Sequence, residues 1–240
     1  MEARDVRPVE TAHFPRTPAS FRISSMEPYQ RLLLENKAWA EEKIAHDSAF
    51  FHRQLKQQQP DFLWIGCSDS RVPAEIVVNA TPGEIFVHRN IANQIITTDC
   101  NSLSVVEYAV QVLEVKHVIV CGHYACGGIK AALDKQRPDL TLVNNWLMHI
   151  KDIYRLHEDS IESLPTQEAR INRLVELNII EQVTKLTHTP IIQQAWRKRG
   201  GPTLHGWVYG LENGLIEQLI TLTPEHKVES IYQFTDLLKP

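Results

Sequence analysis

Two short segments of this chain carry residue types that bind metal ions in proteins. Residues 67–71 read Cys-Ser-Asp-Ser-Arg, and residues 123–126 read His-Tyr-Ala-Cys. Cys67 and Cys126 offer thiolates and His123 offers an imidazole, which are ligands that zinc prefers. Structural zinc sites are closed by four protein ligands, whereas catalytic sites keep one position for water or substrate. Three ligands without a fourth therefore indicate a catalytic zinc site.

Asp69 and Arg71 follow the first cysteine and are separated by one residue. In a tight loop, an arginine fork holds a carboxylate through two parallel hydrogen bonds. Such a pair would keep Asp69 near the metal without ligating it and would leave the fourth position to water. The alternative for these two residues is an ordinary surface ion pair, worth about 0–1 kcal/mol. For Cys67, Cys126 and His123, the alternative is that they bind no metal and are two buried cysteines beside a hydrogen-bonded histidine.

Predicted strands end just before both segments and must position them. Residues 62–65 form a short apolar run that leads to Cys67, and residues 117–121 form a second run that leads to His123. Short apolar runs of this kind are typical of buried strands in parallel sheets. In open α/β sheets, ligands bind beyond the carboxyl ends of the strands. We therefore expect the two segments to meet at one edge of a sheet.

Helical and strand patterns alternate along the rest of the chain. The predicted helices cover residues 29–45, 73–78, 104–115, 145–159 and 166–186, and the further strands cover residues 84–88, 204–210 and 215–223. Asn213-Gly214, between the last two strands, is a strong hairpin signal. The order predicts an α/β fold with a mainly parallel central β-sheet, flanking helices, an antiparallel C-terminal strand addition and an N-terminal helical arm.

Two of these helices carry more detailed expectations. The spacing of apolar residues in the first helix predicts five buried positions, which are Leu32, Leu33, Ala38, Trp39 and Ile44. In the helix over residues 104–115, Ser104 and Glu107 have the spacing of a capping box, which predicts that this helix begins at Ser104.

The composition of the 240-residue chain is that of an ordinary globular protein, with 43% hydrophobic and 22% charged residues. Its net charge of −4 gives no reason to expect a nucleic-acid or anionic-membrane partner. Four cysteines are too few for a disulfide scaffold in a chain of this length, so a reducing compartment fits better. No apolar run approaches the roughly 18–20 residues needed to span a bilayer. We therefore expect a cytoplasmic protein.

The N-terminal segment, residues 1–25, is expected to be separate from the rest of the chain. Its arginines and serines are typical of organelle transit peptides, whereas its three acidic residues are not. We expect a flexible tail over residues 1–25 and a single catalytic domain over residues 26–240, and we leave organelle targeting open.

Four segments together resemble the signatures of the β-class carbonic anhydrases: residues 67–71, 82–90, 121–128 and 205–210, the last reading His-Gly-Trp-Val-Tyr-Gly. The likeness runs in consistent order from about residue 30 to about residue 222. It implies reversible hydration of carbon dioxide to bicarbonate and a proton, through a hydroxide bound to one zinc ion per subunit. It also implies a homodimer or a homotetramer.

The resemblance assigns a role to each matching residue. Cys67, His123 and Cys126 would be the zinc ligands, and Asp69 with Arg71 would be the catalytic dyad. Zinc lowers the pKa of bound water from 15.7 to about 7, and Asp69 would accept a hydrogen bond from the resulting hydroxide. Two further residues, Tyr108 and Gly127, would line the substrate pocket.

A bicarbonate-regulated, bacterial-type subgroup of the family is matched as well. Trp64, Arg89 and Tyr209 match the residues that form a non-catalytic bicarbonate pocket in that subgroup. There, Arg71 would release Asp69, which would bind zinc as the fourth ligand and close the site. Thr81 stands where the plant-type subgroup carries a glutamine that binds substrate, which favours the regulated subgroup.

Two other functions are compatible with the same residues. A carbon disulfide or carbonyl sulfide hydrolase would use the same fold and the same ligands. A non-catalytic zinc- or bicarbonate-sensing homologue would keep the fold, although it would have little need of both Asp69 and Arg71. A zinc nucleoside deaminase is disfavoured because its His-x-Glu and Pro-Cys-x-x-Cys signature is absent from the sequence.

Overall fold

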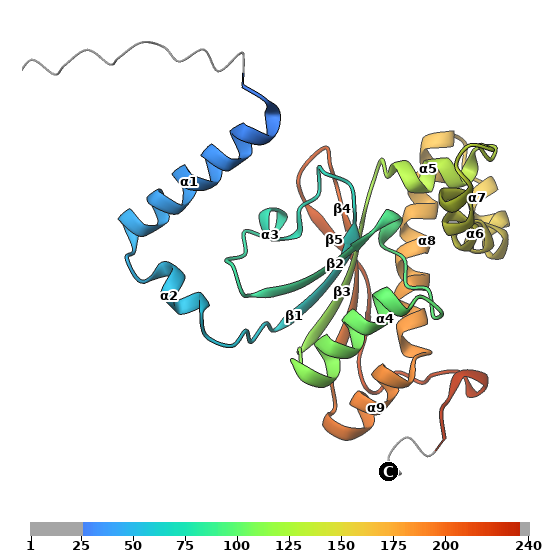
Figure 1. Ribbon diagram of the computed structural model, residues 1–240. Helices are drawn as coiled ribbons and strands as arrows, with labels where there is room; N and C mark the ends of the chain where they lie inside the picture. The colour runs from blue at the N-terminus through green and yellow to red at the C-terminus, as the bar shows by residue number, and fades with distance from the viewer. Residues whose placement is uncertain (1–25, 236–240) are drawn as a thin grey trace, which may run out of the picture. The chain divides into compact units, whose positions relative to one another are not determined.

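A computed structural model of the chain describes residues 26–235 (Figure 1). The predicted tail over residues 1–25 lies outside the described residues. Contacts divide the chain into two compact units, one ending at Leu55 and the other beginning at Lys56. The expectation of one domain over residues 26–240 stays a prediction, and each unit is described by itself.

The first unit contains two helices, α1 (Pro28–His46) and α2 (Phe50–Gln54). Proline at the first position of α1 suits a helix start, because its missing N–H would have no partner there. Three aromatic rings join the helices edge to face: the Trp39 ring lies 6.1 Å from Phe50 and 5.6 Å from Phe51. The predicted helix over residues 29–45 is confirmed.

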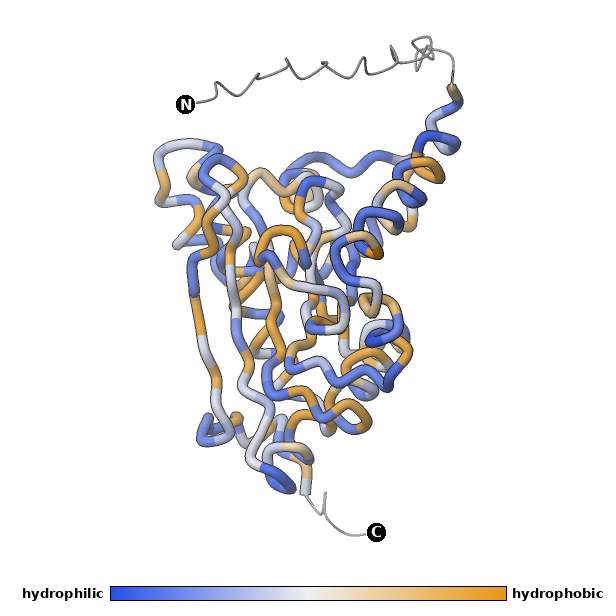
Figure 2. Tube along the Cα trace, turned by 90° about the vertical axis from the view of Figure 1, so that its left-hand side faces the viewer, coloured by the Kyte–Doolittle hydropathy of each residue, from blue (hydrophilic) through white to orange (hydrophobic). Residues whose placement is uncertain are grey.

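The buried positions expected in α1 are wrong. Leu32, Leu33, Trp39 and Ile44 are 63%, 67%, 40% and 51% exposed, Ala38 is exposed too, and no residue of α1 is buried. Apolar and polar residues do alternate along α1 (Figure 2). Periodicity shows that a helix has apolar positions, but whether they are covered depends on what packs against them.

The second unit is built on a five-stranded sheet in the order β2-β1-β3-β4-β5. Its strands are β1 (Phe62–Cys67), β2 (Ile85–Asn90), β3 (His117–His123), β4 (Thr203–Tyr209) and β5 (Ile216–Leu222). The first four strands are parallel, and β5 pairs antiparallel with β4. The predicted α/β fold with its antiparallel C-terminal strand is confirmed.

Helices lie on both faces of this sheet, but unequally (Figure 1). One face is covered by the long helix α8 (Gln167–Thr187) together with α4 (Cys100–Glu107) and α9 (Pro190–Arg199), around an apolar core. The other face carries a smaller cluster to which α3 (Ala74–Val77) contributes. The remaining helices, α5 (Gly127–Leu133), α6 (Thr141–Leu156) and α7 (Glu158–Glu162), pack with α8 beyond the ends of β1 and β3.

The predicted start of the helix over residues 104–115 is wrong. This helix, α4, begins four residues earlier, because Asp99 accepts hydrogen bonds from the backbone N–H groups of Asn101 and Ser102. Aspartate is as good a cap as serine, and it comes first in the chain. The Ser104 hydroxyl instead donates to the Asn101 carbonyl within the helix.

After α4, the helix widens into a π-helical turn, η3 (Tyr108–Val112). The hairpin signal at Asn213-Gly214 is confirmed as an antiparallel connection, with Gly214 in the left-handed region at φ 71°. Among residues 26–235, no helix is long and apolar enough to cross a membrane.

Candidate metal centre

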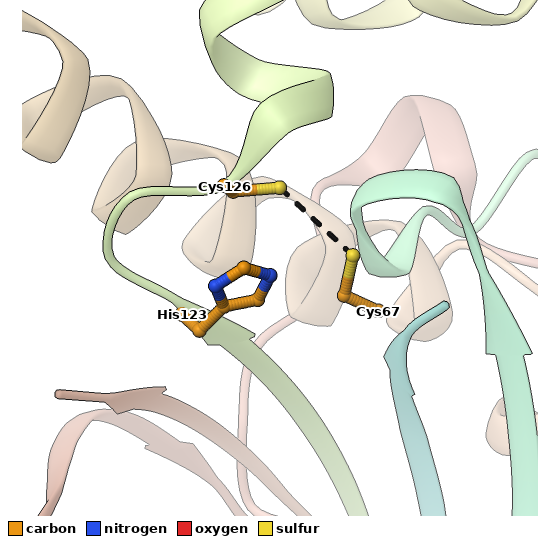
Figure 3. Close-up of side chains that lie close together, drawn as sticks. All are labelled: Cys67, His123 and Cys126. Atoms are coloured by element: carbon orange, nitrogen blue, oxygen red, sulfur yellow. Dashed lines mark hydrogen bonds between the residues drawn. The ribbon is translucent and has the colours of Figure 1, made fainter. Parts of the chain in front are cut away.

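The three candidate ligands come together at the carboxyl end of the sheet. Cys67 ends β1 and His123 ends the neighbouring parallel strand β3, while Cys126 is the residue that precedes α5. Their ligand atoms all lie within 4.8 Å of one another, and the two sulfur atoms are 3.9 Å apart (Figure 3). All three side chains are buried. The predicted meeting of the two segments is confirmed.

The imidazole of His123 is oriented for metal binding. Its Nδ1 lies 2.8 Å from the carbonyl oxygen of Tyr124 and donates to it, because a carbonyl only accepts. Nε2 therefore carries the lone pair, and within residues 26–235 this buried atom has no hydrogen-bond partner. A buried polar atom without a partner costs free energy. Two sulfurs and a free imidazole nitrogen fit a zinc ion, which satisfies all three.

The electrostatics of the two thiols also fit a cation. Its hydrogen bond with Cys126 lowers the pKa of Cys67. The thiolate of Cys67, together with burial, raises the pKa of Cys126. Without a cation, Cys67 therefore loses its proton readily, whereas Cys126 keeps its proton. A divalent ion between the sulfurs would stabilise both thiolates.

The predicted arginine fork is present beside these ligands. Arg71 donates from Nε to Oδ1 of Asp69 at 2.9 Å and from Nη2 to Oδ2 at 2.7 Å. These hydrogen bonds hold the pKa of Asp69 well below its usual range, so the carboxyl is ionised at neutral pH. Oδ2 lies 3.7 Å from Nε2 of His123. The carboxylate thus stands next to the ligand set while the guanidinium holds it.

The three residues predicted for a bicarbonate pocket lie on one face of the sheet. In the sheet register, Arg89 of β2 lies beside Gly66 of β1, and Gly66 is two residues after Trp64 in that strand. Tyr209 of β4 lies beside His123 of β3. A Cβ on Gly66 would lie 2.7 Å from Nε1 of Trp64, so the indole N–H lies over this glycine. Trp64 is 3% exposed and joins Tyr209 in the same apolar cluster.

Arg89 also contacts the metal segment directly. It donates from Nε to the Cys67 carbonyl at 2.8 Å and from Nη2 to the Asp69 carbonyl at 2.6 Å. It therefore holds the backbone that carries the first ligand and the carboxylate. The sequence expectation did not include this contact.

The two residues predicted to line the substrate pocket lie in different places. Gly127 is the first residue of α5 and follows Cys126 directly. Tyr108 begins the π-helical turn η3, is 44% exposed, and packs its ring 5.8 Å from that of Phe86 in β2. The role of Tyr108 and Gly127 in substrate binding stays a prediction.

Sequence reasoning missed a buried polar pair in α8 that supports the site. Nδ2 of Asn178 donates to the Ala92 carbonyl at 3.0 Å, and Nε2 of Gln182 donates to Oδ1 of Asn178 at 2.9 Å. Ala92 has a left-handed backbone, at φ 62° and ψ 32°, and lies with Cys67 in one buried apolar cluster. The sequence signal that could have identified this pair is the position of Asn178 and Gln182, one turn apart on the apolar side of the predicted helix 166–186.

Comparison with known proteins decides the family. A family model described as carbonic anhydrase matches residues 62–216. A carbonic anhydrase from Emericella nidulans is 46% identical over 193 residues, which is 80% of this chain and 84% of the relative. One chain from the crystal structures of two tetrameric β-carbonic anhydrases of Sordaria macrospora is 36% identical, with a TM-score of 0.78, over 81% of this chain and 98% of that one. The chain belongs to the β-carbonic anhydrase family.

A second solved β-carbonic anhydrase, from Aspergillus fumigatus, supports the same assignment. It is 36% identical, has a TM-score of 0.76, and covers 80% of this chain and 91% of its own. The segment that the carbonic anhydrase model matches contains all three candidate ligands, Asp69 and Arg71. The resemblance to β-class carbonic anhydrases is therefore confirmed at the level of the family, and helices α1 and α2 lie before the matched segment.

Proposed function

We propose that this β-carbonic anhydrase catalyses the reversible hydration of carbon dioxide to bicarbonate and a proton, with one zinc ion per subunit. The observation that supports it is the joint position of two groups. The first is the buried set of Cys67, His123 and Cys126, with ligand atoms within 4.8 Å of one another. The second is the Asp69 carboxylate, held 3.7 Å from His123 by Arg71.

The residues of the site divide the work of the reaction. Cys67, His123 and Cys126 would hold zinc, which lowers the pKa of a bound water to about 7 when present. Asp69 would accept a hydrogen bond from the attacking water and direct a lone pair of its oxygen toward the carbon of the substrate. Arg71 keeps Asp69 ionised and in place through its two hydrogen bonds. Carbon dioxide is uncharged, so apolar neighbours suit it.

Stopped-flow hydration of carbon dioxide on the zinc-loaded protein at about pH 8–9 tests this function. We expect rapid hydration that a zinc chelator abolishes. Cys126→Ser should lose both zinc and activity, because it removes a ligand. The control is Cys100→Ser, since Cys100 is an exposed cysteine outside the site and its replacement should change neither.

Three outcomes would contradict the proposal. A zinc-loaded protein that does not accelerate hydration would reject the activity. Hydrolysis of carbon disulfide or carbonyl sulfide by the same preparation, without hydration of carbon dioxide, would assign it to the hydrolase alternative. Zinc binding without either activity would favour the sensing homologue.

We further propose that bicarbonate inhibits the enzyme at Trp64, Arg89 and Tyr209. The support is the contact of Arg89 with the carbonyls of Cys67 and Asp69. A bicarbonate ion bound to Arg89 would compete for the same donors and loosen this backbone. Asp69 would then leave Arg71 and become the fourth metal ligand, which closes the site. Bicarbonate would shift the equilibrium between these two conformations of the loop because it binds the closed one more tightly than the open one.

Bicarbonate inhibition of single variants tests this regulation. Trp64→Ala and Tyr209→Ala should each weaken the inhibition while zinc remains bound. Tyr154→Ala is the control, because Tyr154 lies in α6 and bonds Glu162 in α7, away from the proposed pocket. An inhibition profile that is the same in all variants and the wild type would reject the pocket.

We also propose that the protein is a homo-oligomer, either a dimer or a tetramer. Several large apolar side chains of α1 are exposed in the single chain, among them Leu32 and Leu33. Contiguous exposed apolar surface is typical of protein interfaces. The related enzymes from Sordaria macrospora are tetrameric.

A further inference from the structure

We infer that Tyr124 and Glu176 form a positioning pair that orients His123 and Cys126 for metal binding. The inference rests on the proposed zinc function and goes beyond it, because neither residue is a ligand or a member of the dyad. Tyr124 lies in the loop between the two candidate ligands, and Glu176 lies in α8. Figure 1 labels this long helix beside the sheet.

Tyr124 is tied to its surroundings at three points. Its carbonyl accepts the hydrogen bond from Nδ1 of His123, at 2.8 Å. Its backbone N–H donates to the carbonyl of Tyr209 in β4, at 3.1 Å. Its hydroxyl donates to Oε1 of Glu176, at 3.0 Å. The hydrogen bond from His123 fixes the orientation of the imidazole ring. The other two hydrogen bonds fix the position of Tyr124, whose carbonyl accepts the first.

The loop needs such ties because one of its residues has an unfavourable backbone conformation. Figure 3 shows it running from His123 at the end of β3 to Cys126 at the start of α5. Ala125, in the middle, has a left-handed backbone at φ 54°, which is unfavourable for a residue other than glycine. Strained backbone persists only where surrounding contacts enforce it.

Packing leaves one side of this loop open. A pocket of about 720 Å³ is lined by Tyr124, Ala125 and Cys126 on one side, and by residues of α8 and of the β4–β5 connection on the other. A loop beside such a space has room to shift. The hydrogen bond from Tyr124 to Glu176 ties the loop to α8 and opposes the shift.

Glu176 is itself held in place. Its second oxygen, Oε2, accepts a hydrogen bond from Nη1 of Arg173, one turn earlier in α8, at 2.9 Å. The long helix α8 thereby fixes the side chain of the loop residue that bonds His123.

Zinc affinity of matched variants tests the pair. Tyr124→Phe removes only the hydroxyl, and Glu176→Ala removes its acceptor. Loss of a partner that orients a metal ligand costs about 10–100-fold in metal affinity, and we expect each variant to weaken zinc binding by about this factor in competition with a chelator. The double variant should lose no more than the larger single loss, because both changes break the same hydrogen bond.

Three comparisons separate positioning from simple stabilisation. Glu176→Gln keeps an acceptor oxygen and should restore part of the affinity that Glu176→Ala loses. Cobalt-loaded Tyr124→Phe should show altered visible absorption, because the ligand geometry around the ion changes. Tyr154→Phe is the matched control: it removes the same kind of hydrogen bond, to Glu162 at 2.8 Å, and should leave zinc affinity unchanged.

The outcomes distinguish this inference from the proposed function. Variants that bind zinc as tightly as the wild type, with an unchanged cobalt spectrum, overturn the positioning pair and leave the proposed function standing. Equal loss of stability in the metal-free variants, without loss of zinc affinity, also overturns it. A wild-type protein that binds no zinc overturns both.

Discussion

Asp69 and Arg71 illustrate how position changes the meaning of a residue pair. The chain contains a second fork of the same kind, in which Arg137 donates to both oxygens of Asp139. The carboxylate of Asp139 is 59% exposed, whereas that of Asp69 is 17% exposed and lies beside His123. Exposed ion pairs contribute about 0–1 kcal/mol to stability. The environment alone therefore makes the first pair a candidate for catalysis.

Asp69→Asn tests the role of the carboxylate. The amide keeps the shape but loses the charge and one acceptor oxygen, so the attacking water is no longer oriented. We expect hydration to slow by about a hundredfold or more, which is within the range for groups that assist proton transfer. Stopped-flow rates and bound zinc per subunit are the measurements, and zinc should remain bound.

The matched control for this change is Asp139→Asn, which removes the charge from the exposed fork and should leave the hydration rate unchanged. Full activity of Asp69→Asn with zinc bound would remove the role assigned to Asp69.

At the scale of elements, α8 is the helix that supports the candidate site, through hydrogen bonds of its buried side chains. Asn178 and Gln182 are 1% and 0% exposed, and Gln182 accepts a hydrogen bond from the backbone N–H of Ile95 at 2.7 Å. Together they hold the turn η2 (Ile91–Asn93), whose Ala92 lies with Cys67 in one buried apolar cluster. A buried network of this kind is stable only when every member has a partner.

Asn178→Ala tests the contribution of this network. The change leaves the buried carbonyl of Ala92 without its donor and Gln182 without its acceptor. An unsatisfied buried polar group costs about 1–3 kcal/mol, so the free energy of unfolding should fall by at least about 2 kcal/mol. Chemical denaturation of the metal-free protein measures it.

Thr184→Ala in the same helix serves as the control, because the hydroxyl of Thr184 donates only to the Ile180 carbonyl of its own helix. Its effect should stay well below that of Asn178→Ala. Equal effects of the two changes would contradict a special role for the network.

At the scale of the whole molecule, exposed apolar side chains of α1 carry the expectation of self-association. Tyr29, Leu32, Leu33 and Ile44 are each more than half exposed, at 62%, 63%, 67% and 51%. Surface of this kind is stabilised when a second molecule covers it, because apolar area leaves water. The N-terminal arm is therefore the part of the chain from which an interface is expected.

Leu33→Glu tests this expectation. A charge placed in an apolar interface is costly to bury, so the variant should shift from dimer or tetramer toward monomer. Light scattering coupled to size-exclusion chromatography measures the mass. Gln30→Glu adds the same charge at an exposed polar position of α1 and should keep the wild-type mass. A monomeric wild-type protein would contradict the proposed oligomer.

Much of the sheet and the ligand set could be predicted because their signals are local. The apolar runs before Cys67 and His123 mark the strands, and the carboxyl ends of parallel strands share one edge of a sheet. The Asn213-Gly214 pair marks the hairpin in the same way. The choice of candidate ligands follows from residue type and spacing, which need no tertiary information.

Contacts between distant segments decided the rest. Asn178 meets Ala92 across 86 positions and Tyr124 meets Glu176 across 52, and no local pattern in the sequence names such partners. The burial expected along α1 failed for the same reason, because periodicity identifies an apolar side but not its cover. The sequence by itself determined which residues can bind a metal, and that Cys67 and His123 lie at the ends of strands. The tertiary structure decided how these residues are oriented, because orientation depends on side chains that the fold alone brings together.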